Sequence, residues 1–260
     1  MASKSRLDSL LVSRGLAENR TRAQALILSG VVFSEGNRLD KPGYKISEGA
    51  LINVRMKKSQ WVSRGGEKLF HALNHFDLPV NGLHCLDIGS STGGFTEVLL
   101  QKGAAHVDSV DVGRGQLDWN LRNNERVKVL EGINARYLTR DQISTKPHVV
   151  VCDASFIGLR TLLPAALTLA EASAFLIALI KPQFEVGKGR VGKGGVVRDP
   201  DLHIEVCQNI EHWLVEEMGW HVHETIESTL QGPKGNKEFF ICAQNTASNH
   251  DTDLWGKQPS

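Results

Sequence analysis

The pattern of apolar and polar positions changes about a third of the way along the chain. In residues 1–58, a helical pattern capped by Ser3 and stopped by Gly15 is followed by a second one, capped by Asn19 and stopped by Gly30. Short apolar runs separated by glycine and proline come next and predict short strands. We therefore expect a small α+β domain at the front of the chain, whose core is marginal on its own.

Strand-length apolar runs alternate with helix-like segments in the rest of the chain. They read HCLDIG, HVDSVDVG, VKVLEG, HVVVCDAS and SAFLIALI, between residues 84 and 180. This alternation is typical of a doubly wound parallel sheet. An amphipathic helix predicted over 199–218 is followed by WHVHETIES and EFFICAQ, which can add two strands at the sheet edge. The expected fold class is α/β, with a second domain over 67–245 after a linker over 59–66.

Three segments need a separate interpretation. Residues 161–180 are apolar enough to span a bilayer, but Pro164 and Glu171 interrupt them, so we expect a helix, a turn and a buried strand. The first 15 residues carry charges inside their apolar stretch and do not have the pattern of a signal peptide. Residues 246–260 are polar and aperiodic, and we expect a disordered tail there.

Charge separates the two parts of the chain. The 260 residues hold 30 basic and 29 acidic side chains, a net charge of +1, but residues 1–60 hold 11 basic and 5 acidic ones. The front is therefore +6 and the remainder −5. Such an excess of one sign favours an anionic partner, with nucleic acid ahead of a membrane surface.

Composition and cysteine spacing exclude several classes. At 41% hydrophobic and 23% charged residues, the chain is neither wholly disordered nor collagen-like. The four cysteines are far apart, with no CxxC and no histidine at ligand spacing. We therefore expect reduced thiols, no metal site and a cytoplasmic protein.

A glycine-rich turn, DIGSSTGGFTE over 87–97, follows the first strand of the predicted sheet. Glycines allow a sharp turn and close approach to a ligand, and the next helix offers its N-terminal amides. The second strand ends at Asp111, where a carboxylate can accept hydrogen bonds from a ribose. Both a dinucleotide and an adenosyl cofactor fit this pattern, although GxGxxG and the GK[ST] phosphate loop are absent. A purely structural turn is the alternative.

Four ionisable residues lie where an open α/β sheet carries its chemistry. Asp153 and Lys181 end neighbouring strands and should lie side by side, because carboxyl ends of parallel strands line the ligand crevice. Glu238 opens the last strand and Lys68 precedes the sheet. Each alone could be an exposed boundary residue, but Lys181 stands between six largely apolar residues and Pro182.

Two resemblances sharpen these expectations. RLDSLL, NRTRAQALILSGVVF and ISEGALINV resemble an S4 RNA-binding domain over most of residues 5–56. The long motifs DIGSSTGGFTEVLLQKGAAHVDSVDVGRGQLDWNLRN, VCDASFIGL, LIKPQFEVGKGRVGKGGVVRDP and GPKGNKEFF closely resemble the TlyA family over roughly residues 5–244. In that family an S4 domain precedes an FtsJ-like methyltransferase that acts on the 2′-hydroxyl of ribosomal RNA, often at cytidine. The resemblance implies a Rossmann-like, seven-stranded class I methyltransferase sheet.

The resemblance also implies site residues and partners. The FtsJ-like tetrad Lys-Asp-Lys-Glu corresponds to Lys68, Asp153, Lys181 and Glu238. The cofactor implied is S-adenosylmethionine, and the residues that match its site are Asp87, Gly89, Ser90, Ser91, Thr92, Gly93, Gly94, Phe95, Asp111, Val112 and Asn134. The implied partner is ribosomal RNA or a ribosomal subunit, met by a monomer with no membrane contact. The basic residues expected to face RNA are Arg6, Arg20, Arg22, Lys41, Arg64, Lys188, Arg190 and Lys193.

Methyl transfer to a ribose hydroxyl needs alignment and removal of a proton. Our hypothesis is that Lys181 is the base or steers the hydroxyl, that Asp153 fixes it, and that Lys68 with Glu238 positions the ribose and phosphate. The alternatives are an RNA-binding protein with an inactive methyltransferase-like domain, and a membrane-active hemolysin, a label that members of this family often carry. A pseudouridine synthase or an NAD enzyme would not need the lysines at these positions.

Overall fold

The computed structural model describes residues 3–28, 30–54, 60–187 and 189–246. The chain forms two compact units, Met1–Ser59 and Gln60–Ser260, called here the N-terminal and the C-terminal unit. Lys188 and residues 247–260, most of the predicted tail, lie outside the described part.

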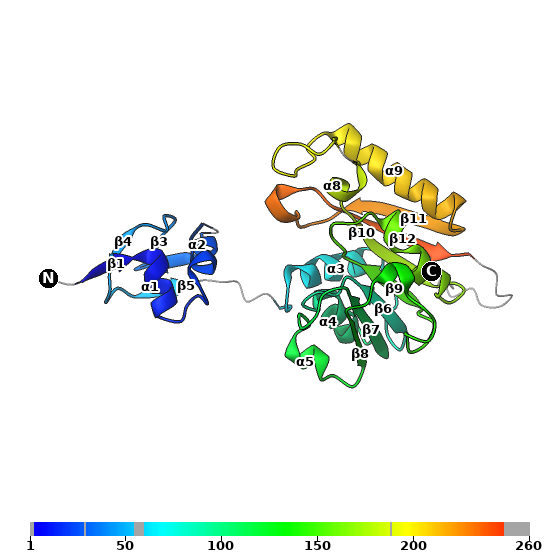
Figure 1. Cartoon of the computed structure of the whole chain (residues 1–260), viewed down its shortest axis with the longest axis horizontal. Helices are drawn as coiled ribbons and strands as arrows, with labels where there is room; N and C mark the ends of the chain where they lie inside the picture. Colours follow the sequence, from blue (N-terminus) through cyan, green and yellow to red (C-terminus); the bar gives the residue numbers. More distant parts are fainter. Residues whose placement is uncertain (1–2, 29, 55–59, 188, 247–260) are drawn as a thin grey trace, which may run out of the picture. The chain divides into compact units, whose positions relative to one another are not determined.

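The N-terminal unit has two helices and two small antiparallel sheets (Figure 1). Its elements are β1 (Lys4–Arg6), α1 (Leu7–Ser13), α2 (Arg20–Leu28), β2 (Val32–Ser34), β3 (Asn37–Arg38), β4 (Lys45–Ser47) and β5 (Ile52–Val54). Strand β1 pairs with β4, and the second sheet has the order β3-β2-β5. Asn19 caps α2 as predicted, since its Oδ1 accepts from the Arg22 amide at 2.9 Å.

The prediction that Ser3 caps the first helix is wrong. Residues Lys4–Arg6 pair with Lys45–Ser47 as a strand, so α1 begins only at Leu7 and has no side-chain cap. One face of α1 and α2 is buried together, with Leu7, Leu11, Ala23 and Ile27 fully inaccessible. Backbone pairing between β1 and β4 therefore decides where the first helix starts.

The C-terminal unit is built on one seven-stranded sheet of order β11-β12-β10-β9-β6-β7-β8. Its strands are β6 (His84–Ile88), β7 (His106–Asp111), β8 (Val127–Glu131), β9 (Val149–Cys152), β10 (Phe175–Ile180), β11 (Trp220–Glu227) and β12 (Phe239–Asn245). Its helices are α3 (Arg64–His75), α4 (Gly94–Gln101), α5 (Trp119–Arg122), η1 (Ala135–Tyr137), α6 (Leu159–Leu162), α7 (Pro164–Thr168), α8 (Pro182–Glu185), α9 (Pro200–Glu216) and η2 (Pro233–Gly235). The five strands from β8 to β10 are parallel, and β12 runs antiparallel to both of its neighbours. This confirms the predicted α/β class and the seven-stranded sheet.

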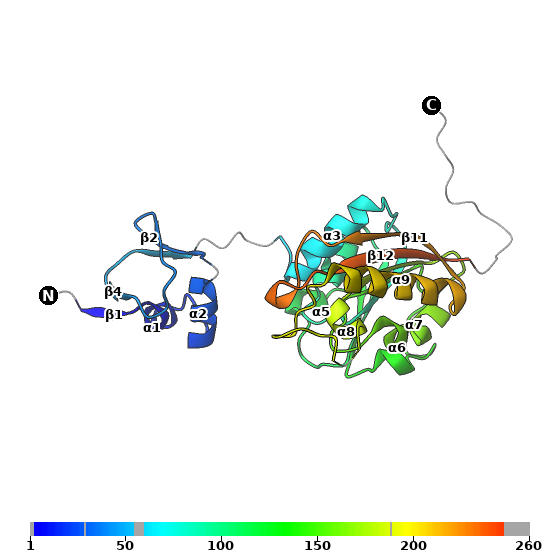
Figure 2. The same cartoon turned by 90° about the horizontal axis from the view of Figure 1, so that it is seen from above.

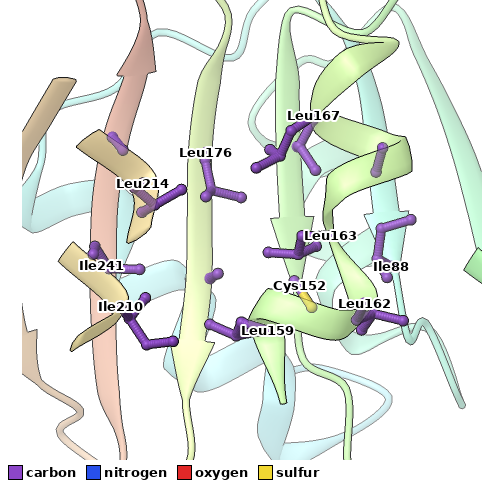
Figure 3. Close-up of a cluster of buried hydrophobic side chains, with 14 of the residues drawn as sticks. Ile88, Cys152, Leu159, Leu162, Leu163, Leu167, Leu176, Ile210, Leu214 and Ile241 are labelled. Carbon is purple, nitrogen blue, oxygen red and sulfur yellow. The ribbon is translucent and has the colours of Figure 1, made fainter. Parts of the chain in front are cut away.

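Helices cover both faces of this sheet, and Figure 2 shows α3 and α9 on opposite sides of β11 and β12. Along β9, Val149 and Val151 face the cluster formed with α3 and α4, whereas Val150 and Cys152 face the cluster formed with α6, α7 and α9. Figure 3 shows the second cluster, in which side chains of the three helices meet the strands. A strand buried on both faces must be apolar throughout, which explains the unbroken apolar runs in the sequence.

The apolar segment 161–180 folds as predicted into helix, turn and strand. Pro164 starts α7 directly after α6, and all six residues of β10 are buried. No helix in the described ranges is both long enough and apolar enough to cross a membrane. Because β10 lies between β9 and β12, the residues at its carboxyl end have neighbours on both sides.

Candidate active site

The glycine-rich turn after β6 brings three chain segments into close contact. Gly89 has φ +79°, and a Cβ there would lie 3.0 Å from the Cα of Ala154 in the loop after β9. Gly94 begins α4, and a Cβ there would lie 2.7 Å from the Gly66 amide nitrogen in α3. The absence of side chains at these glycines lets α3, α4 and the β9 loop approach the same point.

Asp153 and Lys181 form a close ion pair at the carboxyl ends of β9 and β10. Lys181 Nζ lies 2.5 Å from Asp153 Oδ1 and donates to Ser155 Oγ at 3.0 Å. The Lys181 side chain is 8% exposed and that of Asp153 is 21% exposed. The two residues therefore lie side by side, as the strand ends predict.

Lys68 and Glu238 form a second, more deeply buried ion pair. Lys68 lies on α3, and Glu238 is the residue directly before β12 in the sequence. The distance from Lys68 Nζ to Glu238 Oε2 is 2.5 Å. The Glu238 side chain is inaccessible, and its other oxygen, Oε1, has no hydrogen-bond partner in the described ranges. A Cβ at Gly232 would collide with Oε1, so the turn before η2 closes over this carboxylate.

Both ion pairs line one cavity of about 260 Å³. The cavity wall also includes Ser63, Gly65, Gly89, Ser90, Ser91, Thr92, Gly94, Phe95 and Ser155. Four residues that are far apart in the sequence, Lys68, Asp153, Lys181 and Glu238, thus meet around one small space. Two lysines and two carboxylates held out of solvent can orient a hydroxyl group and exchange a proton with it.

A larger cavity of about 790 Å³ adjoins the first and shares Gly89, Ser91, Asp153 and Ser155 with it. It runs past Asp111 and Val112 at the end of β7 to Ile133 and Asn134 after β8. Asp111 Oδ2 accepts from the Ser91 amide at 2.8 Å and Oδ1 accepts from the Gly113 amide at 2.6 Å. Each carboxylate oxygen can accept a further hydrogen bond, for example from a hydroxyl group of a ligand.

The loop at this cavity is held by Glu131, a residue that the sequence reading did not single out. Its carboxylate accepts from the amides of Gly115 and Gln116 at 2.9 and 3.1 Å and pairs with Arg122 at 2.6 Å. Arg122 and the loop amides lower the pKa of Glu131 to about 2. Gln116, held in this way, lines the cavity and accepts from Ser91 Oγ at 3.3 Å.

The predicted cofactor residues do not all line the cavities. Asp87 is inaccessible, accepts from Thr96 Oγ1 at 2.6 Å, and belongs to neither cavity wall, and burial raises its pKa to about 7. Gly93, with φ +97°, is the N-cap of α4 and lies outside both walls. Asn134 lines the larger cavity while its Oδ1 caps η1 through the Arg136 amide. Asp87 and Gly93 thus lie behind the residues that line the cavities, and their role in cofactor binding stays a prediction.

Phe156, an exposed aromatic residue at the larger cavity, was also not predicted from the sequence. Phe156 is 91% exposed and has φ +68°, which is uncommon for a bulky side chain. It lies against Phe184, with ring centroids 5.3 Å apart. The signal was its place three residues after Asp153, in a loop that follows a strand end.

Two of the predicted RNA-facing residues of the N-terminal unit form ion pairs with a buried carboxylate. Arg6 and Arg20 both contact Asp8, a fully buried carboxylate, at 2.9 and 3.0 Å, and these contacts hold the pKa of Asp8 well below its usual range. Arg22 and Lys41 are exposed on the same unit. Although Arg6 and Arg20 each contact Asp8, their side chains stay about half exposed.

Two of the predicted RNA-facing residues of the C-terminal unit, Arg64 and Arg190, also have partners within the protein. Arg64 donates to the Gln231 carbonyl at 2.9 Å, and Arg190 forms a two-pronged pair with Glu205 at 2.5 and 2.6 Å. Lys193 is exposed, and Lys188 lies outside the described residues. The glycine-rich loop is tied to the segment before Glu238, because Asn236 Nδ2 donates to the Gly195 carbonyl and its Oδ1 accepts from the Val197 amide.

Comparison with known proteins places this site in a family. A family model for the FtsJ-like methyltransferase matches residues 61–245, and a model for the S4 domain matches residues 5–52. The Mycobacterium tuberculosis protein named 16S/23S rRNA (cytidine-2′-O)-methyltransferase TlyA is 49% identical, over 93% of this chain and 90% of its own. The Campylobacter jejuni protein named 23S rRNA (cytidine-2′-O)-methyltransferase TlyA is 32% identical, over 87% and 82%.

A solved structure is similar over nearly the whole chain. It is that of a Streptococcus thermophilus protein named as a hemolysin, which has 39% identity and a TM-score of 0.76 and covers 95% of this chain and 90% of its own. In the described part of the chain, no group of His, Cys, Asp or Glu has the arrangement of a metal site. With an S4 domain ahead of an FtsJ-like methyltransferase domain, this chain belongs to the TlyA family of FtsJ-like methyltransferases.

Proposed function

We propose that this chain transfers a methyl group from S-adenosylmethionine to the 2′-hydroxyl of a ribose in ribosomal RNA, at a cytidine. The observation that carries the proposal is the convergence of Lys68, Asp153, Lys181 and Glu238 on one cavity that adjoins a larger one. The name of the M. tuberculosis relative supports the substrate class. The higher identity to that protein than to the C. jejuni one favours action on both ribosomal RNAs.

The larger cavity fits the cofactor. Its volume of about 790 Å³ lies within the range of roughly 300 to 1,000 Å³ that small-molecule sites occupy. Asp111 would accept from the ribose hydroxyls, Ile133 and Asn134 would contact the adenine, and Gly89 with Ser91 would hold the methionine part. S-adenosylmethionine supplies a methyl group that its positive sulfur makes electrophilic.

Asp153 lines both cavities, and Lys181, its ion-pair partner, lines the small one. We assign to Lys181 the contact with the attacking hydroxyl, whose proton its amine steers or accepts. Asp153, at 2.5 Å, and Ser155, at 3.0 Å, fix the direction of that amine. A lysine with three rotatable donors needs such anchors to keep one geometry.

Lys68 and Glu238 line the same small cavity as Asp153 and Lys181. We assign to this pair the positioning of the ribose and its phosphate, because Lys68 offers an ammonium and Glu238 keeps one oxygen without a partner in the described ranges. Phe156, exposed beside Ser155, offers a flat face on which a base can stack. The basic residues of the N-terminal unit, Arg22 and Lys41 among them, would hold the surrounding RNA through its phosphates.

The test is methyl transfer to ribosomal subunits. Purified wild-type chain with radiolabelled S-adenosylmethionine should label RNA of small and large subunits prepared from cells that lack the protein, and mapping of 2′-O-methyl groups should find cytidine. Lys181→Ala should reduce transfer by about 100-fold or more while cofactor binding is kept. Lys102→Ala is the matched control, since Lys102 is a partly exposed lysine that contacts Asn74 and lines neither cavity.

The outcomes separate the proposed parts. No label in either subunit would refute the proposed reaction, and label in one subunit alone would refute action on both. Near-normal transfer by Lys181→Ala, with Lys102→Ala unchanged, would leave the reaction in place and remove the role given to Lys181. Label retained after the ribose 2′-hydroxyl of the target is replaced by hydrogen would show methylation of a base instead.

A further inference from the structure

Two short segments meet beside the small cavity, and their contacts extend beyond the ion pair. The first segment, 153–159, follows β9 and carries Asp153 and Phe156, and the second, 181–185, follows β10 and begins with Lys181. The lysine amine contacts the first segment at its start, through Asp153 and Ser155. The rings of Phe156 and Phe184 touch in the middle, with centroids 5.3 Å apart.

Glu185 makes the contact at the far end of the two segments. Its Oε1 accepts from the Leu159 amide at 2.8 Å. That amide is the first of α6, whose N-cap residue, Gly158, has no side chain to bond it. A Cβ at Gly158 would lie 2.7 Å from Glu185 Oε2, so the carboxylate fills the space that a capping side chain would occupy. Glu185 thus supplies a helix cap from a different part of the chain.

The loop that Glu185 holds needs support from outside. Phe156 has φ +68°, a backbone conformation that bulky residues adopt only when their surroundings enforce it. Lys181 fixes this loop on one side of Phe156 and Glu185 fixes it on the other. Ser155 and Phe156, held between these two ties, line the larger cavity.

We propose that Glu185 is a positioning residue for methyl transfer, which acts by holding the 153–159 loop against the segment that carries Lys181. The inference rests on the proposed function and extends it to a residue that lines neither cavity. The accepting oxygen is the feature that matters. The Leu159 amide needs only an oxygen that accepts its hydrogen bond, and an amide side chain also offers one. Burial raises the pKa of Glu185, against the opposing effects of the Leu159 amide and Arg160.

The test compares two substitutions that separate the oxygen from the charge. Glu185→Gln keeps an oxygen that can accept from the Leu159 amide, and Glu185→Leu removes it at similar size. The turnover number is measured per titrated cofactor site, so that any unfolded fraction does not enter. We expect Glu185→Leu to lower it by about 10- to 100-fold, the size of effect that a small misplacement of reacting groups produces. Glu185→Gln should stay within about threefold of wild type.

Glu217→Leu is the matched control. Glu217 is an exposed glutamate that contacts the same helix, α6, through Arg160 at 2.7 Å, and its loss should change turnover by less than about twofold. The inference is overturned if the turnover number of Glu185→Leu equals that of wild type. It is overturned as well if the turnover number of Glu185→Gln falls tenfold or more. It is also overturned if Glu217→Leu is as slow as Glu185→Leu. Absence of transfer by the wild-type chain would instead refute the proposed function.

Discussion

The buried pair of Lys68 and Glu238 allows a prediction of stability that does not depend on activity. Glu238 is inaccessible, and Lys68 is the only partner that the structure records for its carboxylate oxygens within the described ranges. In Lys68→Met, the carboxyl must stay charged without a counterion or take up a proton. A free glutamate has a pKa of about 4.3, so protonation at pH 7.5 costs about 4 kcal/mol, at 1.36 kcal/mol per pH unit. The variant should lose about 3 to 4 kcal/mol of unfolding free energy.

The sign of the pH dependence follows from the same reasoning. A buried carboxyl that is neutral in Lys68→Met would hold a proton that the unfolded state lacks above about pH 4.3, so we expect the stability of the variant to fall as pH rises. At pH 5.5 the protonation cost is only about 2 kcal/mol. The penalty of the substitution should therefore shrink by about 2 to 3 kcal/mol between pH 7.5 and pH 5.5. A penalty that does not change over this interval would contradict the reasoning.

A double-mutant cycle completes the test. Glu238→Leu alone should also cost about 3 to 5 kcal/mol because it leaves a buried ammonium, while Lys68→Met with Glu238→Leu should cost less than either change alone. Urea unfolding followed by tryptophan fluorescence measures this, because the tryptophans in the described ranges all lie in the C-terminal unit. They are Trp61, Trp119, Trp213 and Trp220. Additive costs in the double variant would show that the two side chains do not interact.

Three further predictions concern other buried or charged groups. Burial raises the pKa of Asp87 to about 7, so its charge should destabilise the fold increasingly as pH rises from about 4 to 7; Asp87→Asn should raise the urea midpoint at pH 8 and not at pH 4. Asp8→Ala should speed hydrogen exchange throughout α1 and α2, because Arg6 and Arg20 lose their shared acceptor, with exchange in the C-terminal unit unchanged. Replacing Arg190 and Lys193 by Gln should lower the salt dependence of RNA affinity by one to two units of slope, measured by filter binding; an unchanged slope would remove these residues from the RNA contacts.

The fold could be predicted because the apolar pattern of each strand shows how that strand is buried. The strands β9 and β10 are buried on both faces, so their sequences are apolar throughout and can be recognised one at a time. The start of α1 could not be found in this way, because backbone pairing between β1 and β4 decides it. Such pairing joins residues about forty positions apart and leaves no local signal at Ser3.

Supporting residues at the site were harder to predict than reacting ones. Glu131 was missed although it ends β8 in register with Asp111 at the end of β7. Its role depends on the amides of the 113–117 loop, and backbone amides have no signature in the sequence. Glu185 was missed for the same reason, since its partner is a main-chain group of Leu159. Side chains that meet side chains can be inferred from strand ends, whereas side chains that bind the main chain require the fold.

The place of Glu238 shows how one reversed strand completes the site. Asp153 and Lys181 directly follow the parallel strands β9 and β10, so they lie at the same edge of the sheet. Glu238 precedes its strand, and in a wholly parallel sheet it would lie at the opposite edge. Because β12 is antiparallel to β10 and pairs Ile180 with Phe239, the residue before β12 lies at the edge where β10 ends. A slip of one residue in this pairing would move Glu238 by about 3.3 Å and turn it to the other face of the sheet, away from Lys68.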